Sequence, residues 1–189
     1  MTENNYKFIK KFYMVMIIFT ALGAAAGAFY YTGLGDAQDN INNYVGTLFD
    51  TVKNGTDGRA VMLGALKEYF ITAAVFTVLS LIRPGVILIP APAVRYGFIY
   101  GFTNAAIISS MQQKGLYITL IRLPVFFFAL LGIYMLGAVS AGLSVSREGR
   151  KIKFFIFILM ISCTIFCVAA AWDGFLTTTF MKMMSKWLT

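Results

Sequence analysis

Residues 12–31 form an uninterrupted apolar stretch, and this stretch limits the chain to very few folds. It contains no Asp, Glu, Lys or Arg, and Lys10 and Lys11 stand directly before it. Because an α-helix rises about 1.5 Å per residue, a segment of this length crosses a hydrocarbon core of about 30 Å. A helix also hydrogen-bonds its own backbone, as lipid requires. The stretch therefore predicts a transmembrane helix, and its long core and polar continuation argue against a cleaved signal peptide.

Four further apolar stretches follow, separated by basic and polar residues. The chain is 59% hydrophobic and 13% charged, whereas soluble domains average about 45–50% and about 25%. Its length suits one bundle without a second folded domain. We therefore predict a single all-α, polytopic membrane helix bundle over residues 1–189. Its transmembrane helices are expected at residues 12–31, 69–82, 96–111, 123–145 and 154–172, with an upstream extension of the second helix through Ala60–Leu66 left open.

Residues 86–94 are apolar but too short to cross a membrane alone. Arg83-Pro84-Gly85 precedes them, and Pro90 and Pro92 interrupt them. Proline lacks a backbone N–H and disfavours helix in the residue before it. We therefore predict a bent, Pro-broken segment at the interface, with a sixth crossing as the alternative.

Basic residues set the expected orientation, because cytoplasmic loops carry an excess of Lys and Arg. Lys7, Lys10 and Lys11 place the N-terminus in the cytoplasm. Five crossings then place the outer segment, residues 33–59, and the C-terminus outside, although two lysines in the C-terminal tail oppose this orientation. We expect a multi-pass protein of the cytoplasmic membrane. The loops on its cytoplasmic side would hold Arg83, Arg95, Arg147, Arg150, Lys151 and Lys153.

The residues needed for catalysis are scarce. The chain has no His, which excludes Ser–His catalysis, imidazole metal sites and the usual proton shuttle. Cys163 and Cys167 lie one helical turn apart without further Cys or His to complete a metal site. An intramembrane aspartyl protease needs two facing carboxylates, but only Asp173 accompanies a span, at its end. We therefore expect no enzymatic activity, no metal and no cofactor.

Charged residues near the spans indicate either transport or simple anchoring at the interface. Arg83 and Arg95 are expected at inner ends of helices, and Lys67, Glu68, Arg122 and Asp173 at outer ends. Only 14 residues separate Glu68 from Arg83, which is about 21 Å of helix and shorter than the hydrocarbon core. One of these two charges is therefore drawn inward, or the bilayer is thinner there. An ion pair between Glu68 and Arg122 is hypothesised because it would offset part of the cost.

Small residues recur at three- and four-residue intervals in two of the predicted helices. Gly97 and Gly101 lie in the third, and Gly23 and Gly27 in the first. Such positions let helix backbones approach closely, since lipid supplies no hydrophobic drive for association. We therefore expect tight packing at Gly97 and Gly101.

The outer segment contains one apolar helical face, made by Ile41, Val45, Leu48, Phe49 and Val52. Asn54-Gly55 marks the end of this predicted helix. Two interpretations need the same apolar face and both remain open. The helix lies on the outer leaflet, or it binds an extracytoplasmic partner.

The third and fourth spans contain a recognisable series of motifs. These are Arg95-Tyr96-Gly97-Phe98-Ile99-Tyr100-Gly101-Phe102-Thr103, a polar turn at Gln112–Gly115, and Arg122-Leu123-Pro124 opening the next helix. Together they resemble the stage II sporulation protein M family. Tyr44, Leu48 and Phe49 stand where the family has an aromatic-aliphatic helix. The resemblance runs from about Lys10 to the end. Many members carry His-Gly and Glu after the Pro, where this chain has Val125-Phe126-Phe127-Phe128. Members of the sporulation branch also lack the His-Gly and Glu motif, so its absence favours that branch.

The resemblance implies a membrane anchor for two cell-wall hydrolases, the stage II sporulation proteins D and P, which remodel peptidoglycan during forespore engulfment. The expected role is thus a non-enzymatic scaffold, and a small permease or substrate-capturing transporter subunit is the alternative. A polar cavity at membrane depth would favour transport, and a packed core with an exposed outer apolar face would favour a scaffold. The expected partner-binding residues are Ile41, Tyr44, Val45, Leu48, Phe49 and Val52, and the expected structural residues are Gly97, Phe98, Gly101, Phe102, Pro124, Glu68, Arg95 and Arg122.

Overall fold

The computed structural model describes residues 3–53, 57–82, 85–145 and 149–187. Within these described residues, five segments are long and apolar enough to cross a membrane, as many as the sequence predicts, and the predicted all-α bundle is confirmed. The helices are α1 (Glu3–Thr32), α2 (Ala37–Lys53), α3 (Gly58–Leu81), α4 (Gly85–Leu88), α5 (Pro90–Met111), α6 (Gln113–Val145), α7 (Gly149–Ala171), the π-helical segment η1 (Trp172–Thr177) and α8 (Thr178–Trp187).

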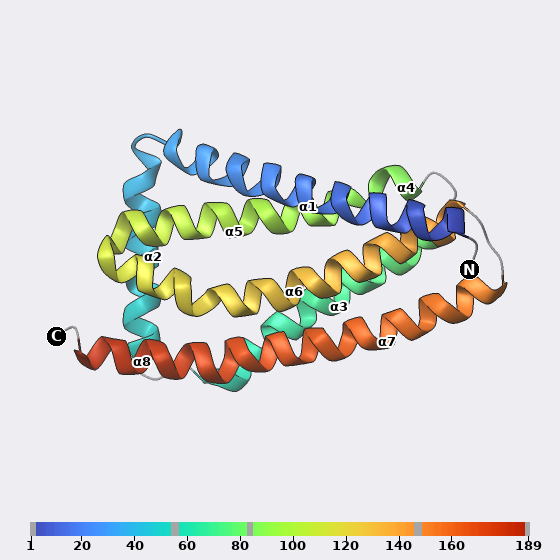
Figure 1. The fold of residues 1–189 in the computed structure, drawn as a ribbon. Coiled ribbons are helices and arrows are strands. Elements are labelled where there is room, and N and C mark those ends of the chain that lie inside the picture. The colour runs from blue at the N-terminus through green and yellow to red at the C-terminus, as the bar shows by residue number, and fades with distance from the viewer. Residues whose placement is uncertain (1–2, 54–56, 83–84, 146–148, 188–189) are drawn as a thin grey trace.

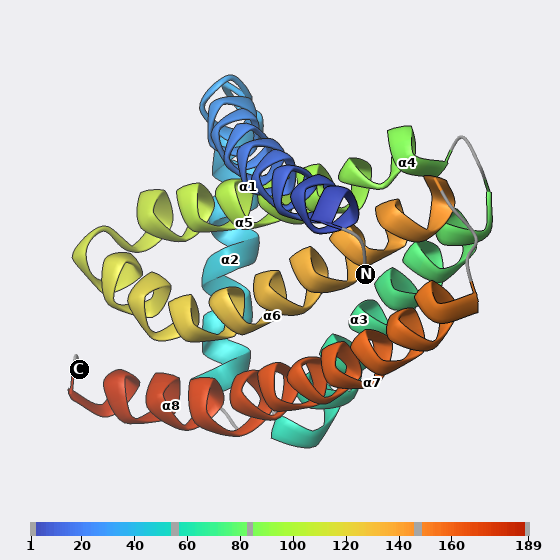
Figure 2. The same cartoon turned by 45° about the vertical axis from the view of Figure 1, so that its right-hand side comes forward.

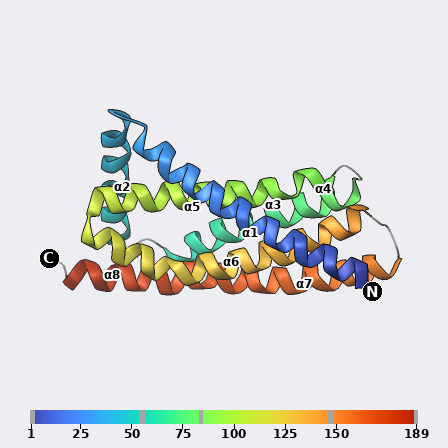
Figure 3. The ribbon, with the colours of Figure 1, turned by 45° about the horizontal axis from the view of Figure 1, so that its top comes forward.

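The long helices run side by side in alternating directions, and α2 lies crosswise at one end of the bundle (Figure 1). α1 begins at one end and α8 finishes at the other, as an odd number of crossings requires (Figure 1). Helix α6 is central and contacts α1, α3, α5 and α7. Figure 2 shows α7, η1 and α8 as one continuous rod, and Figure 3 shows α1 running obliquely across α5 and α6.

Two of the observed helices begin earlier than the apolar stretches predicted. α3 starts at Gly58 rather than residue 69, and the Asp57 carboxylate caps it by accepting a hydrogen bond from the Arg59 backbone N–H at 2.9 Å. α6 starts at Gln113, so the predicted polar turn shrinks to Gln112, whose φ is 49°. The prediction that Pro124 opens a helix is wrong, because Pro124 lies inside α6. In a membrane helix, neighbouring groups can satisfy the carbonyl that proline leaves without a partner.

The predicted Pro-broken segment is also corrected. Its first residues form the short helix α4, and Pro90 and Pro92 lie in the first turn of α5. The first N–H groups of a helix have no partner within that helix, so a proline there removes nothing. The segment therefore begins the third crossing and does not turn back at the interface.

Glycines on α6 receive large side chains from the neighbouring helices. A Cβ added at Gly132 would meet the Phe166 ring, and one at Gly137 would lie 2.6 Å from the Met16 methyl carbon. Phe166, Met16 and Phe76 are fully buried as a result. The bundle core is thus built around the centre of α6.

The closest helix contact joins α1 to α5. A Cβ on Gly97 would collide with the Thr20 carbonyl oxygen, and a Cβ on Gly101 would collide with that of Ala24. Gly23 and Gly27 approach the α5 backbone in the same way. The predicted small-residue positions therefore lie where two backbones meet. Beside them, the Phe98 and Phe102 rings pack against Tyr30 of α1, with ring centroids 5.8 and 6.2 Å from it.

Helix α2 is held against the end of the bundle. The Tyr31 hydroxyl donates to Asn42 Oδ1 at 2.7 Å, and Gln38 Nε2 donates to the Tyr31 carbonyl at 2.8 Å. Val45 is buried and Ile41 is partly buried in a small apolar cluster with residues of α5 and α6. Two residues of the predicted apolar face therefore pack within the chain itself.

Candidate functional site

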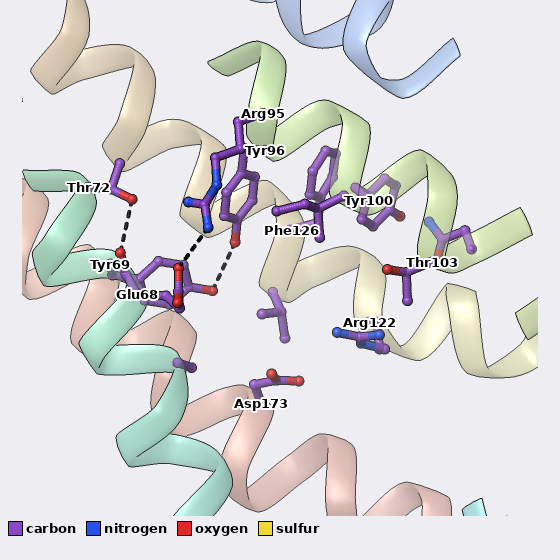
Figure 4. A pocket seen from close by; sticks show the side chains of 14 residues that line it. Glu68, Tyr69, Thr72, Arg95, Tyr96, Tyr100, Thr103, Arg122, Phe126 and Asp173 are labelled. Carbon is purple, nitrogen blue, oxygen red and sulfur yellow. Dashed lines mark hydrogen bonds and ion pairs between the residues drawn. The ribbon is translucent and has the colours of Figure 1, made fainter. Parts of the chain in front are cut away.

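Helices α3, α5, α6 and the segment η1 line a cavity of about 350 Å³ into which charged, hydroxyl and aromatic side chains project. Both α3 and α5 pack on α6, which supplies the floor of the cavity. Figure 4 shows side chains from all four elements pointing into the same space. We call this space the charged cavity because its lining includes Glu68, Arg95, Arg122 and Asp173.

The four charged residues lie well inside the helices that carry them. Glu68, Arg122 and Asp173 each lie about 13–15 Å along the helix from the nearer end of their spans. Arg95 stands in the second turn of α5. The prediction that these charges mark helix ends is therefore wrong. The helices continue past these charges, which line one cavity between them.

Glu68 and Arg95 form an ion pair across the space between α3 and α5, with Arg95 Nη2 at 3.3 Å from Glu68 Oε2. The sequence predicts that these two residues lie at opposite sides of the membrane and that Glu68 pairs with Arg122. Both predictions are wrong. The side chains of Glu68 and Arg95 are 58% and 59% exposed, so the ion pair lies at the rim of the charged cavity rather than in the packed core.

Arg122 and Asp173 occupy the other side of the charged cavity (Figure 4). Both side chains are partly buried. Among the residues that the structure describes, none forms a hydrogen bond or an ion pair with the Arg122 guanidinium or the Asp173 carboxylate. Asp173 belongs to the π-helical segment, a wider turn that interrupts the regular α-helical hydrogen bonds and frequently accompanies functional sites.

Aromatic residues form one wall of the charged cavity, which we call the aromatic wall. The Tyr96 hydroxyl donates to the Tyr69 hydroxyl at 3.1 Å, and the Tyr69 side chain is only 4% exposed. The Phe126 ring stacks on Tyr96 and Tyr100, with interplanar angles of 8° and 10°. Thr103 and Asn104 add further polar groups on α5. The wall thus combines stacked rings with hydroxyl groups.

Two further cavities adjoin the charged cavity and are largely apolar. One, of about 410 Å³, lies toward α2 and shares Thr103, Arg122 and Asp173 with it. The other, of about 360 Å³, runs between α3 and the start of α5 and shares Thr72 and Arg95. We call this second space the α3–α5 groove. Charged groups at the centre are therefore flanked by apolar space on both sides.

Sequence analysis missed the aromatic wall, although one signal pointed to it. Tyr96, Tyr100 and Thr103 follow Arg95 at intervals that place them along one side of α5, opposite Gly97. Polar groups along one side of a transmembrane helix usually face the bundle interior or a water-filled space. That periodicity predicts a polar lining, whereas the position of the other helices had to come from the fold.

Among the described residues, no group of three or more His, Cys, Asp and Glu side chains could hold a metal ion. The charged cavity offers two guanidinium groups and two carboxylates to a ligand, together with hydroxyl groups and stacked rings. Guanidinium groups donate hydrogen bonds to carboxylates and phosphates, and carboxylates accept hydrogen bonds from cationic groups.

The second candidate site is the outward face of α2. Tyr44 and Leu48 are 65% and 46% exposed, whereas Ile41 and Val45 face the bundle. The side chains of Phe49 and Val52 lie outside the described part of the structure. Leu48, however, lines the cavity of about 410 Å³ between α2 and the bundle together with Val45. Of the predicted partner-binding residues that are described, only Tyr44 is therefore presented outward.

Comparison with known proteins gives no relative: no family model, no curated protein and no solved structure matches the chain.

Proposed function

We propose that the protein is a non-enzymatic membrane scaffold that holds extracytoplasmic partners at the α2 end of its bundle. The observation that carries this proposal is the crosswise helix α2, hydrogen-bonded to α1 through Tyr31 and packed on α5. Two large side chains of α2 stay exposed, Tyr44 on the outward face and Leu48 beside the cavity between α2 and the bundle. A helix that is fixed in place loses little conformational entropy when a partner binds to it.

The resemblance to the stage II sporulation protein M family supplies the class of partner. The partners would be the cell-wall hydrolases known as stage II sporulation proteins D and P, which act on peptidoglycan during engulfment. Hydrolases bound at α2 would stay next to the wall while the bundle anchors them. The protein would need no catalytic residue of its own.

This role requires α2 to lie outside the cell membrane. The test uses chains in which Cys163 and Cys167 are replaced by Ala, with one new cysteine at an exposed position of either end, Asn43→Cys in α2 or Phe8→Cys in α1. Asn43→Cys is expected to react with an impermeant thiol reagent in intact cells. Phe8→Cys is expected to react only after permeabilisation. The reverse labelling would place α2 in the cytoplasm and remove the proposed role.

The docking role is tested with the double variant Tyr44→Ser, Leu48→Ser. Each truncation removes up to about 1.5–3 kcal/mol of apolar burial, enough to weaken a micromolar contact more than tenfold. Co-purification of the two hydrolases and engulfment are expected to fail together, with membrane abundance unchanged. The matched control is Asn43→Ser, Thr47→Ser, which alters neighbouring exposed residues of the same helix. Wild-type co-purification in the first double variant would show that α2 does not bind these partners.

The charged cavity favours a second candidate, a small permease or substrate-capturing subunit. Transporters place their binding sites near the middle of the membrane and line them with polar groups. The discriminating measurement is uptake of radiolabelled amino acids and polyamines into proteoliposomes containing the purified protein. Uptake above that of empty vesicles, lost in Arg122→Gln, would favour transport. Its absence, together with loss of hydrolase binding in the α2 variant, would favour the scaffold.

A further inference from the structure

Arg122 and Asp173 present opposite charges to one cavity in a membrane-spanning bundle without being paired. Both line the charged cavity, one from α6 and one from η1 (Figure 4). Within the described chain neither forms a hydrogen bond or an ion pair. A charge that is removed from bulk water needs a counter-charge or a hydrogen-bonding partner. A ligand with an anionic group and a cationic group would satisfy both residues at once.

The Glu68–Arg95 ion pair adds a second requirement. Its side chains are more than half exposed in the space between α3 and α5, and both helices are membrane spans. Hydrocarbon cannot solvate such charges. A polar headgroup in the charged cavity, with its associated water, would solvate the ion pair from the side that the bundle leaves uncovered.

The α3–α5 groove supplies space for an apolar tail. It meets the charged cavity at Thr72 and Arg95 and continues away from Arg122 and Asp173 between α3 and the start of α5. A ligand whose head faces Arg122 and Asp173 would therefore extend its tail along apolar side chains. The residues that would contact the tail are Ile71, Val75, Leu79, Leu88, Ala91 and Pro92.

We propose that the charged cavity and the α3–α5 groove together bind one zwitterionic phospholipid that carries a primary amine, as phosphatidylethanolamine does. Arg122 binds the phosphate, because a guanidinium donates two parallel hydrogen bonds to phosphate oxygens. The Asp173 carboxylate accepts hydrogen bonds from the ammonium group. A quaternary choline nitrogen has no N–H to donate, and a glycerol headgroup has no positive charge. The site therefore distinguishes the amine lipid from both. The proposal does not depend on the scaffold role.

Lipid binding is measured on the purified full-length protein by native mass spectrometry in detergent. The probes are dioleoyl phosphatidylethanolamine, dioleoyl phosphatidylcholine and dioleoyl phosphatidylglycerol, which share the same tails. We expect the ethanolamine lipid to bind about tenfold more tightly than the other two, the size expected for a charged hydrogen bond. Equal apparent Kd values for the three lipids would overturn the proposal, because bulk lipid contact has no such selectivity.

Two variants assign the headgroup contacts. Asp173→Asn is expected to abolish the preference for the ethanolamine lipid. Arg122→Gln is expected to weaken the binding of all three lipids by a similar factor. The matched controls Asp39→Asn and Arg59→Gln change exposed residues that do not line the cavity, and they should bind like the wild type. An unchanged preference in Asp173→Asn would overturn the assignment of the amine.

A third variant tests the tail without altering a charge. Ala91→Phe narrows the α3–α5 groove. It should weaken the binding of all three lipids and leave their order of preference unchanged. The control Ile87→Phe lies on the neighbouring helix α4 at a 77% exposed position outside the groove lining. Soluble phosphoethanolamine, which lacks tails, should compete poorly. If it displaces the lipid at a similar concentration, the ligand is a soluble zwitterion and the lipid proposal fails. These measurements and the selectivity of the wild type remain informative even where a charge variant does not fold.

Discussion

The two sides of helix α5 achieve contact with the rest of the bundle in opposite ways. Toward α1, Gly97 and Gly101 bring the two backbones together. Toward α3, Arg95 reaches an exposed Glu68 across a cavity. The first contact depends on glycines that have no side chain. The second depends on long side chains that reach across the cavity. One helix therefore carries a close contact between backbones and a contact between long side chains beside a cavity, separated by about half a turn.

The largest expected effect is on the side of α5 that faces α1. Gly101→Ala adds a Cβ that collides with the Ala24 carbonyl oxygen, a backbone atom that cannot move alone. We expect a loss of about 1–3 kcal/mol, and more for Gly101→Leu, measured as a lower Tm of the detergent-solubilised protein. Gly64→Ala is the control, since a Cβ there meets no atom within 4 Å and alanine is the better helix former. If both variants melt alike, α1 and α5 do not meet through Gly101.

An intermediate effect is expected in the aromatic wall. Tyr69→Phe removes the acceptor of the Tyr96 hydroxyl, in a position that is 4% exposed. The expected loss is about 0.5–1.5 kcal/mol, visible as a modest fall in Tm. Tyr117→Phe, at a 56% exposed position, should leave the Tm unchanged. A Tyr69→Phe protein as stable as the wild type would mean that water replaces the lost hydroxyl and that the wall is wetter than its packing suggests.

The smallest effect is expected at the rim of the cavity. A double-mutant cycle with Glu68→Gln and Arg95→Gln isolates the energy of their ion pair. Because both side chains are more than half exposed, we expect a coupling free energy below about 1 kcal/mol. A coupling of several kcal/mol would show that the pair is dry and would make the two sides of α5 alike.

Much of the fold follows from the sequence because a membrane helix must satisfy its own backbone. The predicted helix at residues 12–31 lies within the observed span Lys7–Thr32, and no charge or proline interrupts it. Five crossings follow from the same rule. The apolar period also predicts helix α2, but it does not predict which helices α2 packs against. Only the packed bundle decides that Val45 is buried while Leu48, on the same side of α2, stays 46% exposed beside a cavity.

The errors share one physical cause. Hydropathy treats every charge in a span as if it faced lipid, so Glu68 and Arg95 were placed at opposite ends of helices. Their cost falls when charges on separate helices face one another, and no single segment reveals that meeting. The wrong predictions at Pro90 and Pro124 have a similar cause. Whether a helix tolerates a proline depends on the position of the proline in the helix and on the groups around it. The charged cavity can therefore be recognised only in the folded structure, although each of its residues can be read from the sequence.

The glycine contact between α1 and α5 also has a consequence in time. A ribosome adds about 5–20 residues per second, and α5 is complete only roughly 80 residues after α1 ends at Thr32. For about 4–16 s, the first helix has its surface at Gly23 and Gly27 without the partner that will cover it. During that interval another helix with small residues could occupy the surface. Correct assembly therefore requires that no other helix occupies the Gly23 and Gly27 surface of α1 before α5 is made.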